Sequence, residues 1–192
     1  RHPRILVLYL VPNILALQSC YMDDPAMNCP QPTLSPADAV AAGRVLFEVA
    51  CTTALSLGSE RDQAFMLLDG SRKVAVLKVS NEKQDPTDLD MESEAAFHAK
   101  DADRSLPIIT PRVLTSPGCS TGTTRALWTQ HHYSGTTFHW CRCYTVADGI
   151  CMDDNTGLLP DGTLNRWGAA AAQVDRSLRR FWHPAAHRKT LW

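Results

Sequence analysis

Apolar residues change their spacing along this chain, and the changes mark its expected elements. Val40, Gly43 and Phe47 follow one another at intervals of three or four residues, the spacing of one helical face. Ser35 precedes this stripe as a helix cap, and a first-turn proline comes directly after it. The pattern predicts a short amphipathic helix over residues 36–50.

From residue 51 onward the pattern becomes that of extended strands. Asp69 and Gly70 form a strong hairpin signal, because glycine adopts a positive φ at no steric cost. Three antiparallel strands in a meander are therefore expected, and a fourth strand-like stretch follows much later. The predicted strands are residues 53–57, 63–68, 73–79 and 138–146.

Two further helices are predicted around the fourth strand. Asp85 and Pro86 repeat the cap and first-turn proline and open a helix that runs to about residue 100. Glu92 lies on the inward face of this helix, so a carboxylate interrupts an apolar stripe. A strong amphipathic stripe over residues 164–181 predicts the last helix.

Composition sets broad limits on function. With 192 residues and a formal net charge of -1, the chain carries no global field that favours nucleic acid or a membrane surface as a partner. Seven cysteines without a repeated spacing do not suit a disulfide framework, so we expect reduced thiols and a cytoplasmic location. Residues 1–35 are interpreted as a leader and a proline-rich linker that is poorly ordered.

Lys78 is the centre of the candidate chemistry. Side chains alternate along a strand, so Val76 and Lys78 share one face. In kinases, a strand lysine held by a glutamate of the following helix contacts the ATP phosphates. Glu92 is the expected partner, with Glu94 as its rival. The alternative is a lysine on a solvated strand face.

The blocks that carry a family resemblance are residues 58–65 (GSERDQAF), 76–81 (VLKVSN), 85–86 with 89–91, 140–145 (WCRCYT) with Gly149, and 181–184 with 187–188 and 191–192. They resemble kinases of the aminoglycoside phosphotransferase family, in particular hydroxylysine kinases and the bacterial kinase-like domains fused to class III aminotransferases. Ala64 departs from the asparagine usual in the family, Glu92 departs from a frequent glutamine, and residues 119–133 are longer than its pattern, which indicates an insertion or an unreliable stretch of sequence.

The resemblance implies an α+β fold. It would be a protein-kinase-like N-lobe over residues 36–163, with a five-stranded antiparallel sheet and one packed helix, followed by a helix over 164–192 that begins a C-lobe. It also implies that the turn at 58–62 covers the triphosphate and that Lys78 binds its phosphates. Glu92 would orient Lys78, and the end of the last strand would contact the adenine. The implied nucleotide-binding residues are Gly58, Ser59, Glu60, Arg61, Asp62, Val76, Lys78, Glu92, Tyr144 and Val146.

The function implied by the resemblance is the nucleotide-binding part of a small-molecule kinase. The nucleotide would be ATP or GTP with Mg²⁺, and the acceptor the hydroxyl of a small hydroxylated amine or amino acid. The base and the Mg²⁺ ligands of such an enzyme belong to the C-lobe, so no catalytic or metal-binding residue is expected within these 192 residues, and this chain alone is expected to be inactive. The alternative is a non-catalytic binding module with the same fold.

Other residue groups have two interpretations. Histidines and cysteines near residue 140 suggest zinc, but their spacing favours core packing. Asp153, Asp154 and Asn155 are interpreted as a solvated loop. The aromatic residues of the C-terminal segment are interpreted as a buried stripe that normally packs on a C-lobe, so that its exposure would cause self-association. The two groups are His131, His132, His139, Cys141, Cys143 and Cys151, and Trp167, Phe181, Trp182 and Trp192.

Overall fold

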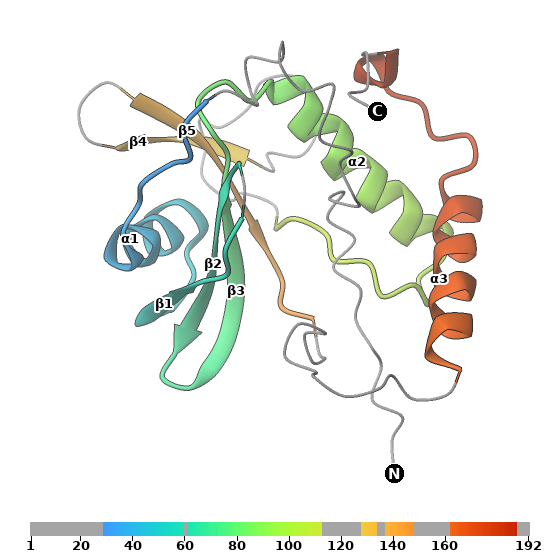
Figure 1. Ribbon diagram of the computed structural model, residues 1–192, viewed down its shortest axis with the longest axis horizontal. Coiled ribbons are helices and arrows are strands. Elements are labelled where there is room, and N and C mark those ends of the chain that lie inside the picture. The colour runs from blue at the N-terminus through green and yellow to red at the C-terminus, as the bar shows by residue number, and fades with distance from the viewer. Residues whose placement is uncertain (1–28, 60, 113–127, 134–136, 148–161, 188–192) are drawn as a thin grey trace.

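An antiparallel sheet forms the centre of the protein (Figure 1). The computed structural model describes residues 29–59, 61–112, 128–133, 137–147 and 162–187. The five strands lie in the order β1-β2-β3-β5-β4, and every neighbouring pair is antiparallel. With the helices, this confirms the α+β class. The strands are β1 (Thr53–Ser56), β2 (Gln63–Asp69), β3 (Arg72–Val79), β4 (Trp128–Tyr133) and β5 (Thr137–Tyr144).

The first three strands form the predicted meander. Gly70 has φ +61° in the turn between β2 and β3, and Gly58 has φ +71° in the connection between β1 and β2. Both values lie in the left-handed region, where a residue without Cβ is least strained. The hairpin signal in the sequence therefore marked a real backbone requirement.

Strand β4 was missed by the sequence analysis. Its residues fall in the stretch 119–133 that was interpreted as an insertion. It pairs with β5 from Trp128↔Arg142 to Tyr133↔Thr137. Its sequence, WTQHHY, lacks the apolar alternation by which a strand is recognised. Its partner β5 begins four positions after Tyr133, so pairing with this adjacent strand decided its structure more than its own side-chain pattern did.

Helix α1 (Pro36–Phe47) covers one face of the sheet. Ser35 and Asp38 form a capping box, in which the Ser35 hydroxyl accepts from the Asp38 N–H and the Asp38 carboxylate accepts from the Ser35 N–H. Glu48 has φ +52° and ends the helix earlier than predicted. The core lies between this helix and the sheet, and includes Ala39, Ala42, Phe47, Phe65, Leu67, Ala75, Leu77, Val79, Cys141 and Cys143.

The residues directly before α1 pack on the domain, which corrects the interpretation of residues 29–35 as a loose linker. Leu34 is buried in the core. Its backbone N–H donates to the Gln63 side chain over 2.8 Å, and its carbonyl accepts from the same side chain over 3.2 Å. Two hydrogen bonds to a side chain that lies 29 positions away cannot be recognised from the composition of a proline-rich stretch.

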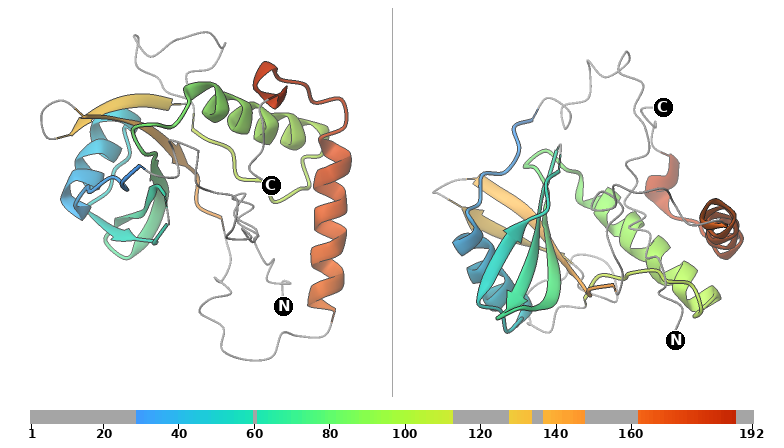
Figure 2. Two further views of the ribbon diagram at one scale, coloured as in Figure 1. Left: turned by 45° about the horizontal axis from the view of Figure 1, so that its top comes forward. Right: turned by 60° about the horizontal axis from the view of Figure 1, so that its bottom comes forward.

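Helix α2 (Pro86–Ala102) lies on the other side of the sheet, next to helix α3 (Thr163–Ser177) and the short 3-10 helix η1 (Pro184–His187) (Figure 2). The Asp85 carboxylate caps α2 by accepting from the Thr87 N–H over 2.8 Å. Within the described ranges, no helix is both long and apolar enough to span a lipid bilayer.

The C-terminal segment differs from its predicted packing. Helix α3 ends at Ser177, four residues before the end of the predicted stripe, and Leu164 at its start is 68% exposed. Trp182 is 67% exposed, whereas Trp167 and Phe181 are half-buried. The expectation that the C-terminal aromatic residues form a core is therefore wrong for Trp182, and Trp192 lies outside the described residues. Among the described residues, α3 packs on α2 and its buried positions are Thr163 and Ser177.

Candidate functional site

The candidate site lies on the face of the sheet that is turned away from α1. Because Cys141 and Cys143 fill the core, the intervening Arg142 faces the opposite way, and Tyr144 shares its side. In the register of β3 and β5, Lys78 is opposite Arg142, and Val76 is opposite Tyr144. Two cations and an apolar pair thus lie next to each other on one face of the sheet, where the Arg142 side chain is buried.

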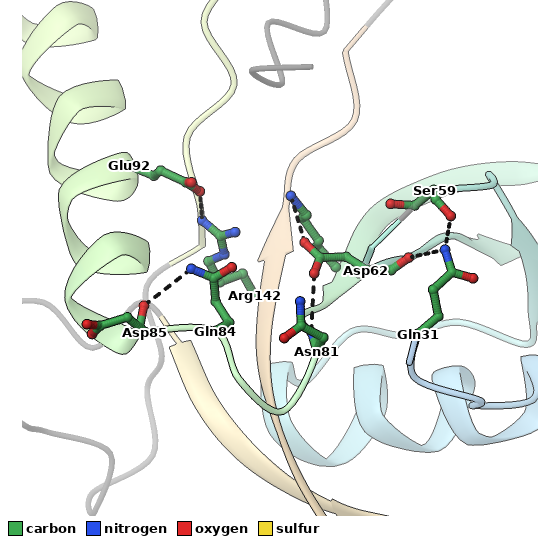
Figure 3. Close-up of polar contacts among 9 residues, drawn as sticks. Gln31, Ser59, Asp62, Asn81, Gln84, Asp85, Glu92 and Arg142 are labelled. Carbon is green, nitrogen blue, oxygen red and sulfur yellow. Dashed lines mark hydrogen bonds and ion pairs between the residues drawn. The ribbon is translucent and has the colours of Figure 1, made fainter. Parts of the chain in front are cut away.

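Lys78 forms an ion pair with Asp62. Its Nζ lies 3.1 Å from Oδ2 of Asp62, and both side chains are largely buried. The other carboxylate oxygen accepts from the Asn81 backbone N–H over 3.2 Å. Figure 3 shows how the Gln31 side-chain amide joins the carbonyls of Ser59 and Asp62, which closes the turn before β2. The position of Asp62 is therefore fixed from two sides.

Arg142 forms the second ion pair, with Glu92 of α2. Nη1 of Arg142 lies 2.7 Å from Oε2 of Glu92, and the two side chains are 2% and 31% exposed (Figure 3). The guanidinium carbon lies 5.8 Å from the centre of the Tyr144 ring, within the range of a cation–π contact. This pair connects α2 to the middle of the sheet.

Burial and charge act in opposite directions on this cluster. Desolvation disfavours the charged form of Arg142, but Tyr144 and the carboxylates of Glu92 and Asp62 outweigh it, so its pKa is raised. Burial also raises the pKa of Tyr144, and the Arg142 guanidinium opposes part of that shift. Both groups therefore keep their ordinary protonation state at neutral pH.

Some buried polar atoms of this region lack a protein hydrogen-bond partner within the described part of the chain. They are Nε of Arg142, Nδ2 of Asn81 and Oγ of Ser80. Leaving a buried donor without a hydrogen bond costs free energy. Such atoms therefore mark places where an oxygen-rich group would supply the missing acceptor. The donor set of two cations and a buried amide fits phosphate oxygens, which accept hydrogen bonds and carry negative charge.

The structure gives Lys78 and Glu92 different partners from those predicted. The carboxylate next to Lys78 belongs to Asp62, which the resemblance placed in the turn over the triphosphate, and the cation next to Glu92 is Arg142. The interpretation that Glu92 orients Lys78 therefore needs correction. Glu92, rather than its rival Glu94, faces the sheet, and Glu94 lines a separate cleft.

Four of the remaining predicted site residues lie in described parts of the chain: Gly58, Ser59, Arg61 and Val146. Gly58 and Ser59 are exposed in the connection between β1 and β2, and Val146 is half-buried just after β5. Nε of Arg61 is buried without a hydrogen-bond partner among the described residues. Glu60, Gly149 and the acids at 153–154 lie outside the residues that the structure describes.

Arg142, Asn81 and Gln31 were missed by the sequence analysis. A signal for Arg142 was present, because a lone charge between two buried cysteines must face the opposite side of its strand. No comparable signal exists for Gln31, which reaches Asp62 across 31 positions of sequence. Contacts of that separation depend on the folded chain.

Cys141 and Cys143 are core residues, as the spacing favoured. Burial raises the pKa of the Cys141 thiol to about 12 and that of Cys143 to about 11. Buried His139 places Nδ1 3.0 Å from the Ser80 carbonyl oxygen. Among the described residues, no group of three or more histidine, cysteine, aspartate or glutamate side chains could hold a metal ion.

No protein-family model matches the chain, and no curated protein matches it.

Proposed function

We propose that this chain binds a nucleoside triphosphate, ATP or GTP with Mg²⁺, on the sheet face that carries Lys78 and Arg142. It would act as the nucleotide-binding lobe of a small-molecule kinase whose acceptor is the hydroxyl of an amino alcohol or hydroxy amino acid. The observation that carries the proposal is the placement of Lys78 and Arg142 opposite each other on β3 and β5. Two adjacent cations on one face of the sheet suit the oxygens of a polyphosphate, and Lys78 is the more accessible of the two.

The order of the elements supports the same proposal. A turn with Gly58 at φ +71° joins the first two strands, Lys78 lies on the third, and a helix with an inward glutamate follows. Kinases use a glycine-rich turn, a lysine on the third strand and a helix glutamate in this sequence. Val76 and Tyr144, opposite each other, offer an apolar surface beside the cations for the base.

The ion pairs suggest how the site would work. Asp62 holds Lys78 in place before the nucleotide arrives, and phosphate oxygens then replace its carboxylate as the partner of Nζ. Glu92 orients Arg142 in the role that the resemblance assigned to it for Lys78. Mg²⁺ would accompany the nucleotide through its phosphates.

A non-catalytic interaction module is the second candidate. Lys78 and Arg142 already have carboxylate partners, so the cluster can be explained as a purely structural link between the sheet and α2. In that case the chain would have no affinity for nucleotide, and its exposed surfaces would carry its function.

Calorimetric titration with Mg·ATP separates the two candidates. Lys78→Met should weaken binding by about tenfold or more, since a charge-assisted hydrogen bond contributes roughly 1.5–3 kcal/mol. Lys73→Met is the matched control, because Lys73 lies on the same strand and is exposed. Absence of binding by the unmodified chain, or equal losses in both variants, would refute the nucleotide proposal.

Asp62→Asn tests the proposed exchange of partners. The substitution keeps an oxygen for the Asn81 N–H and removes the charge that competes for Lys78. Affinity for Mg·ATP should therefore rise. A fall in affinity, with the melting temperature unchanged, would show that Asp62 is needed to aim Lys78 and that no exchange occurs.

A further inference from the structure

A second candidate site lies between α2 and the segment that follows α3. The cleft there has a volume of about 430 Å³ and is bounded by one face of α2 and by residues 180–183. Sites for small ligands usually have volumes of roughly 300–1,000 Å³. The cleft is therefore large enough for a small organic molecule.

Both walls of this cleft are held by the protein's own contacts. Nε2 of His98 lies 3.3 Å from the Arg179 carbonyl oxygen, and Nε2 of His183 lies 3.2 Å from Oδ2 of Asp90. A carbonyl oxygen only accepts, so Nε2 of His98 carries the hydrogen. The His183 ring accepts from the Ala185 N–H at Nδ1, so its neutral form satisfies both contacts.

The charge of the cleft comes from two carboxylates of α2. Glu94 and Asp101 have no hydrogen-bond or ion-pair partner in the described part of the chain. They are seven positions apart, so they lie on one face of the helix about 10.5 Å from each other along its axis. Arg180 is the one guanidinium that lines the described cleft. Two carboxylates against one guanidinium favour a cationic ligand.

Aromatic rings line the space between these charges. Phe97 lies on the same face of α2 as Glu94 and Asp101, and Phe181 and Trp182 line the opposite wall. The Phe181 ring is fixed between two imidazoles, 5.4 Å from His98 and 6.4 Å from His183. Aromatic faces attract ammonium groups and also accommodate an alkyl chain.

We infer that this cleft binds a linear aliphatic diamine, with one ammonium group at Glu94, the other at Asp101 and the alkyl chain along the aromatic rings. The inference is independent of nucleotide binding. Glu92 and Glu94 are two positions apart on α2, which corresponds to a rotation of about 200° around the helix axis. The cleft and the Lys78 face therefore lie on different sides of the helix. A diamine bound here is not positioned as the acceptor of the proposed reaction.

Titration of the whole chain with α,ω-diaminoheptane at low ionic strength tests the inference, followed by calorimetry and by the backbone NMR signals of α2. Saturable binding is expected to shift the signals of residues near 94 and 101. Heptanediol, which has the same length without charge, should not bind, and heptylamine should bind more weakly. Binding of the diol as tightly as the diamine, or no binding of the diamine at millimolar concentration, would overturn the assignment.

Three substitutions sharpen this test. Glu94→Gln and Asp101→Asn should each weaken diamine binding by about fivefold to tenfold, because each removes one charge-assisted contact on a partly exposed surface. Arg180→Gln should strengthen it, since the guanidinium repels the ligand and competes for the carboxylates. Asp175→Asn on exposed α3 is the matched control and should have no effect. A loss of diamine affinity in Arg180→Gln would show that the guanidinium does not oppose the ligand and would overturn the placement of the two ammonium groups.

Discussion

Arg142 is the bulkiest of the fully buried side chains among the described residues, and its ion-pair partner is a carboxylate from another element. Burying a guanidinium is unfavourable unless it is paired and hydrogen-bonded. Its Nη1 is satisfied by Glu92, whereas its Nε has no hydrogen-bond partner among the described residues. The Arg142–Glu92 pair is therefore the contact through which a single substitution should most affect the attachment of α2.

Glu92→Ala should lower the free energy of unfolding by about 1–3 kcal/mol, because it leaves the buried Arg142 without its carboxylate and Glu92 itself is partly exposed. Urea unfolding followed by circular dichroism measures the change. Glu94→Ala is the control two residues away, and its side chain has no hydrogen-bond or ion-pair partner within the described chain. Equal stability losses in the two variants would contradict a specific role for the pair.

Helix α1 approaches the sheet closely at Gly43. A Cβ at this position would lie 2.6 Å from Cδ1 of Leu67 and 3.6 Å from Sγ of Cys51. Leu67 is fully buried, so its methyl group has little room to move. Gly43 is therefore needed for the packing of this element, although glycine within a helix is itself unfavourable.

Gly43→Ala should destabilise the protein by about 1–2 kcal/mol, since overpacking costs roughly 1–3 kcal/mol and the gain in helix propensity offsets about 1 kcal/mol of it. Gly168→Ala in α3 is the matched control, because a Cβ there meets no atom within 4 Å. The control should stabilise the protein by up to about 1 kcal/mol. Thermal unfolding of both variants measures the two changes in stability. A stabilised Gly43→Ala protein would show that the Leu67 side chain can shift to make room for the added methyl group.

The exposed apolar side chains of the C-terminal segment bear on whether the whole molecule associates with other copies. Leu164 and Trp182 are both more than half exposed, and α3 buries Thr163 and Ser177 rather than its apolar stripe. Contiguous apolar patches mark surfaces that associate with another protein, and these two side chains are candidates for contributing to such patches at the two ends of α3. The sequence-based expectation of self-association stays a prediction that this exposure supports.

We expect the sedimentation coefficient to rise with protein concentration in analytical ultracentrifugation, and Leu164→Glu together with Trp182→Ser to reduce that rise. Val45→Ser is the control, since Val45 is also highly exposed but belongs to α1. A monodisperse monomer at high concentration that binds no apolar dye would speak against association through the C-terminal surface.

Local signals in the sequence were sufficient for most elements. Ser35 and Asp85 cap α1 and α2 as predicted, and Gly70 forms the hairpin between β2 and β3. These features depend on interactions between residues within four or five positions, so the side chains that decide them are adjacent in the sequence. Alternation likewise identified Cys141 and Cys143 as buried.

The sequence by itself determined the caps, the periodicities, the hairpin between β2 and β3 and the inward direction of Glu92. Only the tertiary structure decided that β4 joins β5, that Leu34 belongs to the core and which carboxylate each buried cation meets. The physical reason is that an ion pair is selected by distance in the folded chain. Lys78 and Asp62 meet because β2 and β3 are paired neighbours, and Glu92 meets Arg142 across 50 positions because β5 lies between β3 and β4.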